Sequence, residues 1–453
     1  MQIRINKIIL VIFFILTSFS NTLAQEEYSL DDLYRIALER AEEIKISEED
    51  LYIAERGKDK ALSVLLPRLS AFGNYTRYSE SKISGSGWTI QPDWSELWGL
   101  RLDQSLSLSG RELTAFNISK ENIEKSRYDL YAVREDYLLR VSAAYYDVLR
   151  AKKAVEIARA NVERLTKHRD AARTRVRVGE VTKTTLLRAE AELSGAQSEE
   201  IKAKNGLEFV KAVLARIVGI DKAYEVKESR VKSQESEEIK DLQLPTLDLL
   251  KQLALSERVE MKSLELQRQI SEEQVRYTRG AYWPTLSIEG IYSKKDEDPA
   301  SPFLNKESVY GGLKLNFPFF EGGLTKAEVQ EAEARQRQIE LIFEDLKKTI
   351  NIEVENAYLD LKTQEGVLKS FEDQLIFARD NYNAISKQFE YGLADSIDVM
   401  DANTLFVTAE RQLSDARYNY QLAILRLKRA TGTLLKTVIS QQSTVVSQKI
   451  EGE

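Results

Sequence analysis

The sequence predicts a mainly α-helical chain with a membrane β-barrel portion, built from two copies of one unit. Each copy holds a helix, a β-hairpin and a long helical hairpin. Three observations lead to this prediction. Apolar residues recur at helical spacing through most of the chain, two shorter stretches alternate between apolar and polar residues, and both patterns occur twice in the same order.

The duplication rests on features that align at one offset. The separation between Gly179 and Gly392 also joins Ala144-Tyr145 to Ala357-Tyr358. Upstream of Pro284 the offset is slightly larger, so the second copy is a few residues shorter in its β-hairpin region. Matching anchors of this kind predict an internal repeat, with copies at residues 25–225 and 245–432.

The first 24 residues have the pattern of a secretory signal peptide. Arg4 and Lys7 precede the apolar run Ile8 to Leu16, and Thr22-Leu23-Ala24 forms a small-residue cleavage site. The alternative is an uncleaved membrane anchor, but the run is shorter than the roughly 20 apolar residues that a spanning helix needs. The mature chain is therefore expected to leave the cytoplasm without a helical anchor.

Composition excludes several kinds of site. The chain has no cysteine, which excludes disulfides, thiolate metal sites and lipid attachment to cysteine, and its one histidine, His168, excludes zinc sites that need a histidine pair. Between Lys167 and Arg169, His168 is expected to be a solvated surface residue. No nucleophile, base and orienting group recur at a catalytic spacing. We expect no metal, no cofactor and no enzymatic activity, and the net charge of −7 gives no sign of nucleic-acid binding.

The first copy is expected to begin with a helix from Ser29 to Leu66, which Pro67 ends. A β-hairpin at about residues 68–109 follows, and then a long helix from Arg111 to Val178 whose apolar seam includes Leu138, Val141, Tyr145 and Val148. The tip at 178–182 leads into a return helix that ends at Val218.

The second copy repeats this order. The predicted elements are a helix over 247–283, a β-hairpin at about 285–321, a long helix over 325–391, a tip at 391–395 and a return helix over 395–431. Gly392 suits the left-handed residue that ends a helix, and Asp395 or Ser396 can cap the next one. In each copy the two shorter helices, stacked end to end, match the length of the long one, which predicts a helical tube.

The strands of both hairpins alternate between an apolar and a polar face and are long enough to cross an outer membrane. The alternative is a pair of soluble hairpins, but the rest of the chain is coiled-coil-like and offers no globular core to cover them. Four strands cannot close a barrel, and an open edge in lipid leaves backbone groups unpaired at several kcal/mol each. If the strands cross a membrane, the protein must oligomerise.

Two polar segments lie outside the copies. Residues 226–244 form a charged linker, and residues 433–453 form a Ser- and Gln-rich C-terminal tail. The sequence is compatible both with disorder and with packing as a belt around the helices.

Two copies of helix, strand hairpin and long helical hairpin behind a signal peptide resemble the TolC-like outer-membrane efflux protein family. The likeness covers nearly the whole mature chain and is closest at Asp398-Val399-Met400-Asp401-Ala402, Ala416-Arg417-Tyr418-Asn419-Tyr420 and Gly432-Thr433-Leu434. It implies a homotrimer whose twelve-stranded barrel lies in outer-membrane lipid and continues into a trimeric α-helical tunnel. It also implies two partners, a periplasmic adaptor protein and an inner-membrane transporter that supplies the energy.

The resemblance also implies a role for Asp398 and Asp401. In the family, paired aspartates at this position ring the periplasmic pore entrance, and here the two lie one helical turn apart and so on one face. Carboxylates from three chains would converge, attracting cations and resisting anions. The alternative is that both are ordinary acidic residues, favoured by the dipole in the first turn of a helix.

Other residues of the tips are expected to close the entrance or to contact the adaptor. Well-known members of the family hold the entrance shut with an arginine after the tip glycine and an aspartate in the first tip, but Ala394 and Thr185 occupy those positions here. Closure is therefore assigned to Phe389, Tyr391 or Lys183. Adaptor contact is expected at Val178-Gly179 and Tyr391-Gly392, although both pairs could merely turn the chain.

The leading interpretation is an outer-membrane channel and periplasmic duct that exports small molecules or proteins. Two others remain. A periplasmic adaptor is also an exported coiled-coil hairpin, but two complete copies argue against it. A structural coiled coil of the cell envelope leaves the amphipathic strands without a role.

Overall fold

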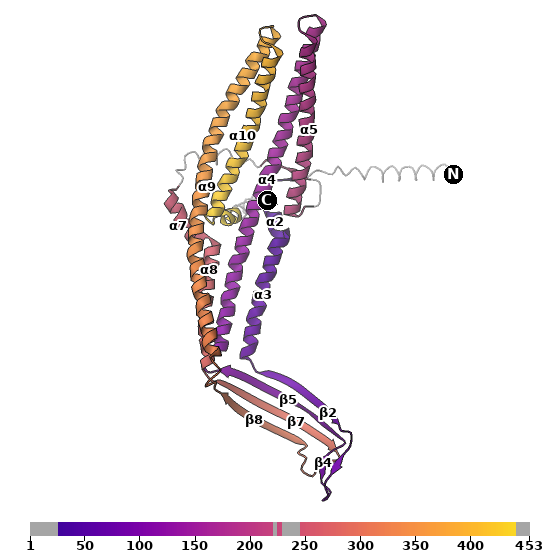
Figure 1. The fold of residues 1–453 in the computed structure, drawn as a ribbon, viewed down its shortest axis with the longest axis vertical. Helices are drawn as coiled ribbons and strands as arrows, with labels where there is room; N and C mark the ends of the chain where they lie inside the picture. The colour runs from indigo at the N-terminus through magenta and orange to yellow at the C-terminus, as the bar shows by residue number, and fades with distance from the viewer. Residues whose placement is uncertain (1–25, 221–223, 229–244, 441–453) are drawn as a thin grey trace, which may run out of the picture. The chain divides into compact units, whose positions relative to one another are not determined.

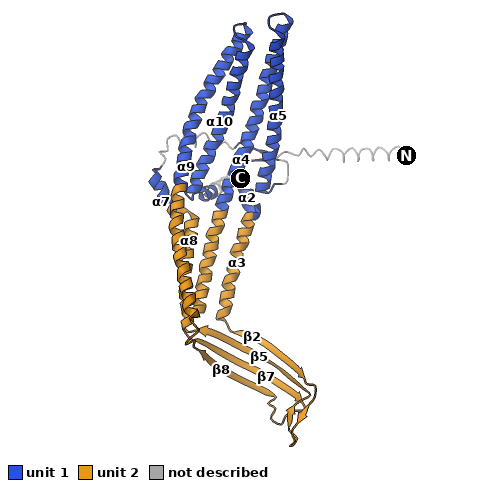
Figure 2. Ribbon diagram, in the orientation of Figure 1, with its two compact units in different colours: residues 1–42, 134–254, 353–453 blue, residues 43–133, 255–352 orange. Residues whose placement is uncertain are grey.

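The computed structural model describes residues 26–220, 224–228 and 245–440. The described chain forms two compact units, shown in different colours in Figure 2. Unit 1 comprises residues 1–42, 134–254 and 353–453, and unit 2 comprises residues 43–133 and 255–352. The predicted signal peptide lies outside the described residues.

The helices follow the predicted order in both copies. In the first copy they are α2 (Leu30–Arg40), α3 (Glu42–Leu65), α4 (Arg111–Arg177) and α5 (Lys183–Val218). In the second copy they are α7 (Leu247–Glu257), α8 (Val259–Arg279), the short 3-10 helix η1 (Gly280–Tyr282), α9 (Leu324–Glu390) and α10 (Ser396–Ala430). Both long helices, α4 and α9, contribute residues to each unit. Within the described ranges, no helix combines the length and apolar composition that crossing a bilayer requires.

The first helix of each copy is interrupted, whereas the sequence predicted one continuous helix. Ala41 separates α2 from α3 with ψ 125°, and Arg258 separates α7 from α8 with ψ 126°. Neither position holds proline or glycine, so no local breaker marks the interruption. The two copies nevertheless break at equivalent residues and with nearly the same ψ.

The strands of unit 2 form one four-stranded antiparallel sheet in the order β2-β5-β7-β8 (Figure 1). The strands are β2 (Arg68–Arg77), β5 (Trp94–Ser107), β7 (Thr285–Asp298) and β8 (Glu307–Asn316). A small hairpin of β3 (Lys82–Ile83) and β4 (Thr89–Gln91) lies in the loop between β2 and β5. Since β5 and β7 pair along their whole length, the hairpins of the two copies form one sheet.

The register gives the sheet one apolar and one polar face, as the alternation predicted. Leu102 lies opposite Leu69, and Leu286 lies opposite both Leu106 and Leu315. Side chains at directly opposed positions of an antiparallel pair share a face. Each of the four strands therefore contributes leucine to this face, which also carries Glu96, Lys294 and Asp296 farther along the strands.

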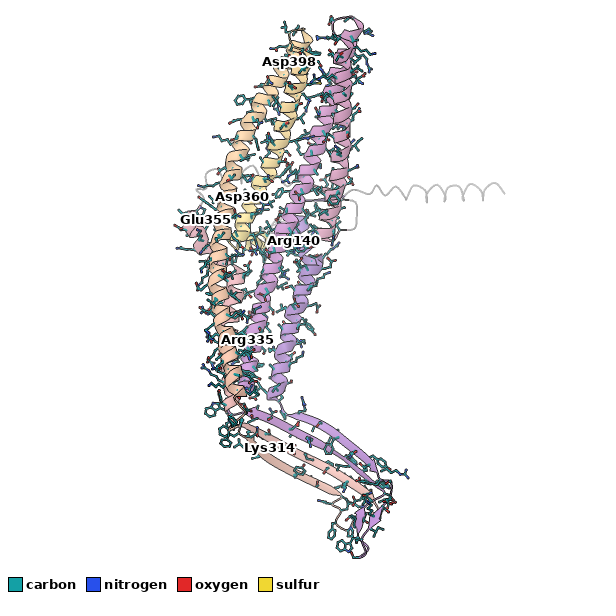
Figure 3. The ribbon with its side chains drawn as sticks, in the orientation of Figure 1. Arg140, Lys314, Arg335, Glu355, Asp360 and Asp398 are labelled. Atoms are coloured by element: carbon teal, nitrogen blue, oxygen red, sulfur yellow. The ribbon has the colours of Figure 1, made fainter. Side chains whose placement is uncertain are left out.

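The opposite face is polar. Asp103 lies opposite Arg68 on one side and Glu289 on the other. The hydroxyls of Ser105 and Ser287 lie 2.8 Å apart. Lys314 belongs to the same face and lies on the edge strand β8 (Figure 3).

Unit 1 is held together by the predicted seam of α4. Leu138, Val141 and Val148 are fully buried, and Tyr145 is 1% exposed. The Tyr145 hydroxyl donates to the carbonyl of Lys227 at 2.9 Å. Residues 224–228 thus pack into unit 1, and the last three of them belong to the predicted charged linker.

Two short segments of unit 1 add to this packing. Strand β6 (Tyr224–Val226) pairs in parallel with β1 (Glu26–Tyr28). Residues 434–440 of the predicted polar tail are helical, and the Glu135 carboxylate accepts the amide N–H of Leu434 at 3.0 Å. The remainder of the linker, 229–244, and of the tail, 441–453, lies outside the described residues.

Candidate functional site at the two hairpin tips

Both predicted tips are tight turns within unit 1 that join the two helices of a hairpin (Figure 1). In the second tip, Gly392 has φ 75°. Its N–H donates to the carbonyl of Phe389 at 3.0 Å, and the N–H of Leu393 donates to Gln388 at 2.8 Å. This pair of bonds is the Schellman motif, which satisfies the last carbonyls of a helix. Gly392 is needed here because other residues rarely adopt positive φ.

The first tip ends α4 in the same way. Gly179 has φ 83°, and its N–H donates to Val176 at 3.2 Å, while the N–H of Glu180 donates to Arg175 at 2.9 Å. The two copies therefore share the backbone of their tips as well as its sequence pattern.

The start of α10 is fixed by two aspartates. One carboxylate oxygen of Asp395 accepts the N–H of Ile397 at 2.7 Å and that of Asp398 at 3.0 Å. The Asp398 carboxylate in turn accepts the N–H of Asp395 at 3.0 Å. These reciprocal bonds form a capping box. They satisfy three N–H groups at the positive end of the helix.

Asp398 and Asp401, the predicted pore residues, are both exposed and lie one turn apart on α10 (Figure 3 labels Asp398). The structure thus brings them together on the face that the spacing predicted. Asp398 has a capping role, which agrees with the alternative interpretation of an acidic residue in the first turn of a helix. The capping bonds fix the Asp398 carboxylate close to the backbone of the turn.

The three candidates for closing the entrance differ in their surroundings. Phe389 is only 4% exposed and contacts α4 of the same chain, whereas Tyr391 is 81% exposed and Lys183 is also exposed. Phe389 therefore acts inside the chain by joining the hairpins, and Tyr391 and Lys183 have side chains available to a neighbouring molecule.

The expectation that His168 is solvated is wrong. His168 is 8% exposed, its Nε2 lies 2.9 Å from the hydroxyl of Ser396, and its ring centroid lies 4.9 Å from that of Phe389. Burial, and to a lesser extent the charge of Arg175, lower the pKa of His168. The flanking charges of Lys167 and Arg169 misled the prediction because they lie on other faces of the helix.

The structure also shows two arginines that sequence reasoning missed. The Arg175 guanidinium lies 4.4 Å from the centre of the Phe389 ring and donates to the carbonyl of Glu390 at 2.8 Å. Arg164 donates to Asn403 at 3.2 Å and to Glu410 at 3.1 Å, with both partners on α10.

These contacts make α4 the element that connects one hairpin to the other within unit 1. Arg164, His168 and Arg175 follow one another at helical spacing, which could have marked them as one polar stripe. Their partners could not be inferred, since they lie more than two hundred residues away in the chain.

The predicted adaptor contacts lie at the surface. Val178 is 62% exposed, Gly179 and Gly392 are exposed, and Leu393 beside Tyr391 is 79% exposed. Each tip thus presents apolar side chains on a rigid turn, an arrangement that suits contact with another protein. Within the described residues, no group of three or more His, Cys, Asp or Glu side chains is placed to hold a metal ion.

Comparison with known proteins decides the family. The profile of the outer membrane efflux protein family matches residues 33–219 and 250–433. The chain belongs to the outer membrane efflux protein family. It is an exit component for efflux or secretion, located in the cell outer membrane and extending into the periplasm.

Two curated relatives show the range of this family. The chain is 25% identical to outer membrane protein TolC of Escherichia coli (strain K12) over 431 residues, which cover 92% of this chain and 85% of TolC. It is 24% identical over 302 residues to alkaline protease secretion protein AprF of Pseudomonas aeruginosa, covering 66% of this chain and 62% of AprF.

Solved structures show the same fold. CusC has a TM-score of 0.78 at 17% identity and covers 90% of this chain and 93% of its own. VceC of Vibrio cholerae has a TM-score of 0.73 at 16% identity, and the match covers 89% of this chain and 96% of VceC. The fold of this efflux-family chain is therefore that of known outer-membrane channels.

Proposed function

We propose that three copies of the chain close a twelve-stranded β-barrel in the outer membrane, continuous with a helical tunnel in the periplasm. The observation that carries this proposal is the leucine face that the register extends across all four strands. An apolar face of this kind suits lipid, and the polar face with Asp103 and Glu289 suits a water-filled lumen. Each chain would contribute its two repeats, residues 25–225 and 245–432.

The edge strands support assembly from more than one chain. Among the described residues of a single chain, β2 and β8 each pair on one side only. Edges cannot stay open in lipid, and barrels of the outer-membrane type have at least about eight strands. Pairing β8 of one copy with β2 of the next satisfies both edges, and the third copy closes the ring.

The tips are the proposed docking surface for a periplasmic adaptor, which links the duct to an inner-membrane transporter. The apolar side chains of Val178 and Tyr391 are exposed on turns whose backbone is fixed. A photo-crosslinker at Tyr391 should capture an adaptor in cells, whereas one at Phe377, which is exposed on α9 away from the tip, should not. Equal capture from both positions would contradict the proposal that the adaptor docks at the tips.

The first experiment on the duct is conductance of the purified mature protein in planar bilayers, with the oligomeric mass measured in the same detergent. A trimer with discrete, cation-selective conductance steps is the expected result. A monomer without conductance would contradict a shared barrel and favour a structural coiled-coil protein of the envelope.

The pore ring is tested by removing charge and keeping shape. Asp398→Asn with Asp401→Asn should weaken block by a multivalent cation at least about tenfold, since each isosteric change removes a carboxylate charge from the entrance. Asparagine retains an acceptor for the capping bond at position 398. Glu192→Gln, at an exposed residue of α5, is the matched control. Unchanged block in the double variant would assign the aspartates to capping alone.

Tyr391 and Lys183 are the proposed closing residues of the resting entrance. Both are exposed within one chain, as a contact between neighbouring copies requires. Larger conductance steps in Tyr391→Ala or Lys183→Ala would support this role, and wild-type steps in both would contradict it.

A further inference from the structure

The one histidine of the chain joins three helices at the tips. His168 on α4 contacts Phe389, in the last turn of α9, and Ser396, the first residue of α10. Ser396 is 6% exposed and Phe389 is 4% exposed, so the contact is closed to water on all three sides. Unlike the surface ion pairs of these helices, it involves an imidazole, whose ordinary pKa of about 6.5 lies close to neutral pH.

The neutral ring fits this contact better than the charged one. A neutral imidazole can either donate to the Ser396 hydroxyl or accept from it, whereas a protonated ring can only donate. Arg175 already lies over the Phe389 ring that His168 contacts. A proton on His168 would therefore place a second positive charge beside Arg175, whose Nε lies 3.7 Å from the exposed carboxylate of Glu180.

Apart from Glu390 and Glu180, the acidic groups nearby are engaged elsewhere. On α10, Asp395 and Asp398 bind backbone N–H groups of the helix start. On α9, Glu390 meets Arg175 through its backbone carbonyl, and on α5 Glu190 binds Arg173 at 2.9 Å. On α4 itself, Asp170 pairs with Arg169 and Glu163 with Lys167. In the described part of the chain, Arg175 is the charged group that acts on His168.

We propose that His168 is a proton-controlled latch, which holds α4 against the α9–α10 tip while it is neutral and releases that tip when it is protonated. The latch itself is a property of one chain. Its consequence for export, an entrance that loosens in acid, rests on the proposed function.

The direction of the pH effect follows from linkage. Burial and Arg175 lower the pKa of His168 in the packed state, and release returns it toward about 6.5. The packed state thus binds fewer protons than the released one. The latch is intact above about pH 6.5 and weakens as pH falls below that value, by at most about tenfold in its equilibrium constant per pH unit.

The first measurement uses the wild-type protein. With ¹³C-labelled histidine and a purification tag that lacks histidine, NMR gives a single imidazole signal, because the chain has one histidine. We expect His168 to titrate below 6.5, and Arg175→Gln to move the midpoint upward. A wild-type midpoint at or above 6.5 would overturn the proposal without any variant having to fold.

The second measurement follows the distance between the hairpins. Since the chain has no cysteine, Arg177→Cys and Leu393→Cys place two spin labels uniquely, one on each tip. Their distance distribution should lengthen or broaden between pH 7.5 and pH 5. The pair Arg177→Cys and Thr184→Cys, within one hairpin, should not change.

A neutral variant separates the latch from general acid effects. His168→Gln keeps a side chain that can hydrogen-bond to Ser396 but cannot titrate, so it should abolish the change in distance with pH. If the change persists in His168→Gln, another group releases the tip and the proposal fails. Because neither readout uses conductance, failure of the proposed channel would leave both results interpretable.

Discussion

At both tips a glycine with positive φ closes a helix with the same two backbone hydrogen bonds, but the helices that follow begin differently. Asp395 caps α10 through its side chain, whereas Thr182, at the equivalent position, makes no side-chain capping bond to α5. The Thr182 hydroxyl lies 3.3 Å from that of Thr185 instead. The two turns thus share their backbone, while the capping interactions and their charge are found at the second tip.

The side chains beneath the turns also differ, because the second tip is packed more closely than the first. Phe389 is buried against His168 and Arg175, and its counterpart in the first tip, Val176, is half-buried. The second tip is therefore fixed by side chains from α4, α9 and α10. The first tip depends more on its backbone bonds.

The largest effect is expected from shortening the buried aromatic residue. Phe389→Ala should destabilise the end of α9 by about 3–5 kcal/mol, the usual cost of removing a buried phenyl ring. Val176→Ala should cost about 1 kcal/mol at the end of α4, because less apolar surface is lost. Hydrogen exchange of the last-turn amides measures both, and equal losses of protection would break the comparison.

Removing the caps should have the next largest effect. Asp395→Ala should cost about 1–2 kcal/mol at the start of α10, or roughly tenfold faster exchange of the Ile397 and Asp398 amides. Thr182→Ala should change exchange at the start of α5 by much less, since no capping bond is lost. The comparison fails if the two substitutions accelerate exchange alike.

Introducing the two aspartates of the second tip at the first tip should have a moderate effect on block of the channel by cations. Thr185 and Arg188 occupy the positions of Asp398 and Asp401 in the first tip. Thr185→Asp with Arg188→Asp should lower the concentration of multivalent cation needed for block by several-fold. Arg188→Ala, which removes the arginine without adding an acid, gives the control. Block that is insensitive to both variants would mean that the first tip lies away from the entrance.

The smallest effect is expected at the exposed ends of the turns. Tyr391→Ala and Val178→Ala should each change local stability by no more than about 0.5 kcal/mol, because both side chains are mostly exposed. Hydrogen exchange at the same amides measures this. A larger loss in Tyr391→Ala would mean that the second tip is held by its outer face as well.

Most of the fold could be predicted because its signals are local or periodic. The alternation of Leu100, Leu102 and Leu106 gives the strand face, and Gly179 and Gly392 give the turns, since each signal lies within a few residues of its effect. The breaks at Ala41 and Arg258 carry no local signal. They could not be placed for that reason.

The site was only partly predictable for a related reason. Asp398 and Asp401 share a face by spacing alone, but the burial of His168 depends on Phe389 and Ser396, which reach it from the other end of the chain. Periodicity predicts which residues share one face of a helix, but it does not predict which distant segment packs against that face. The assignment of Phe389 to one chain's interior likewise required the contacts of α4.

The pairing of β5 with β7 has a consequence for the order in which the chain folds. Ser107 pairs with Thr285, so the entire helical hairpin of α4 and α5 separates two adjacent strands. Contacts between residues so distant in sequence form slowly, because the intervening loop must close first. The helical hairpins, whose contacts are local, should be complete while the leucine face is still exposed to water. During that interval the strands are the part of the molecule most prone to aggregation and most in need of a chaperone.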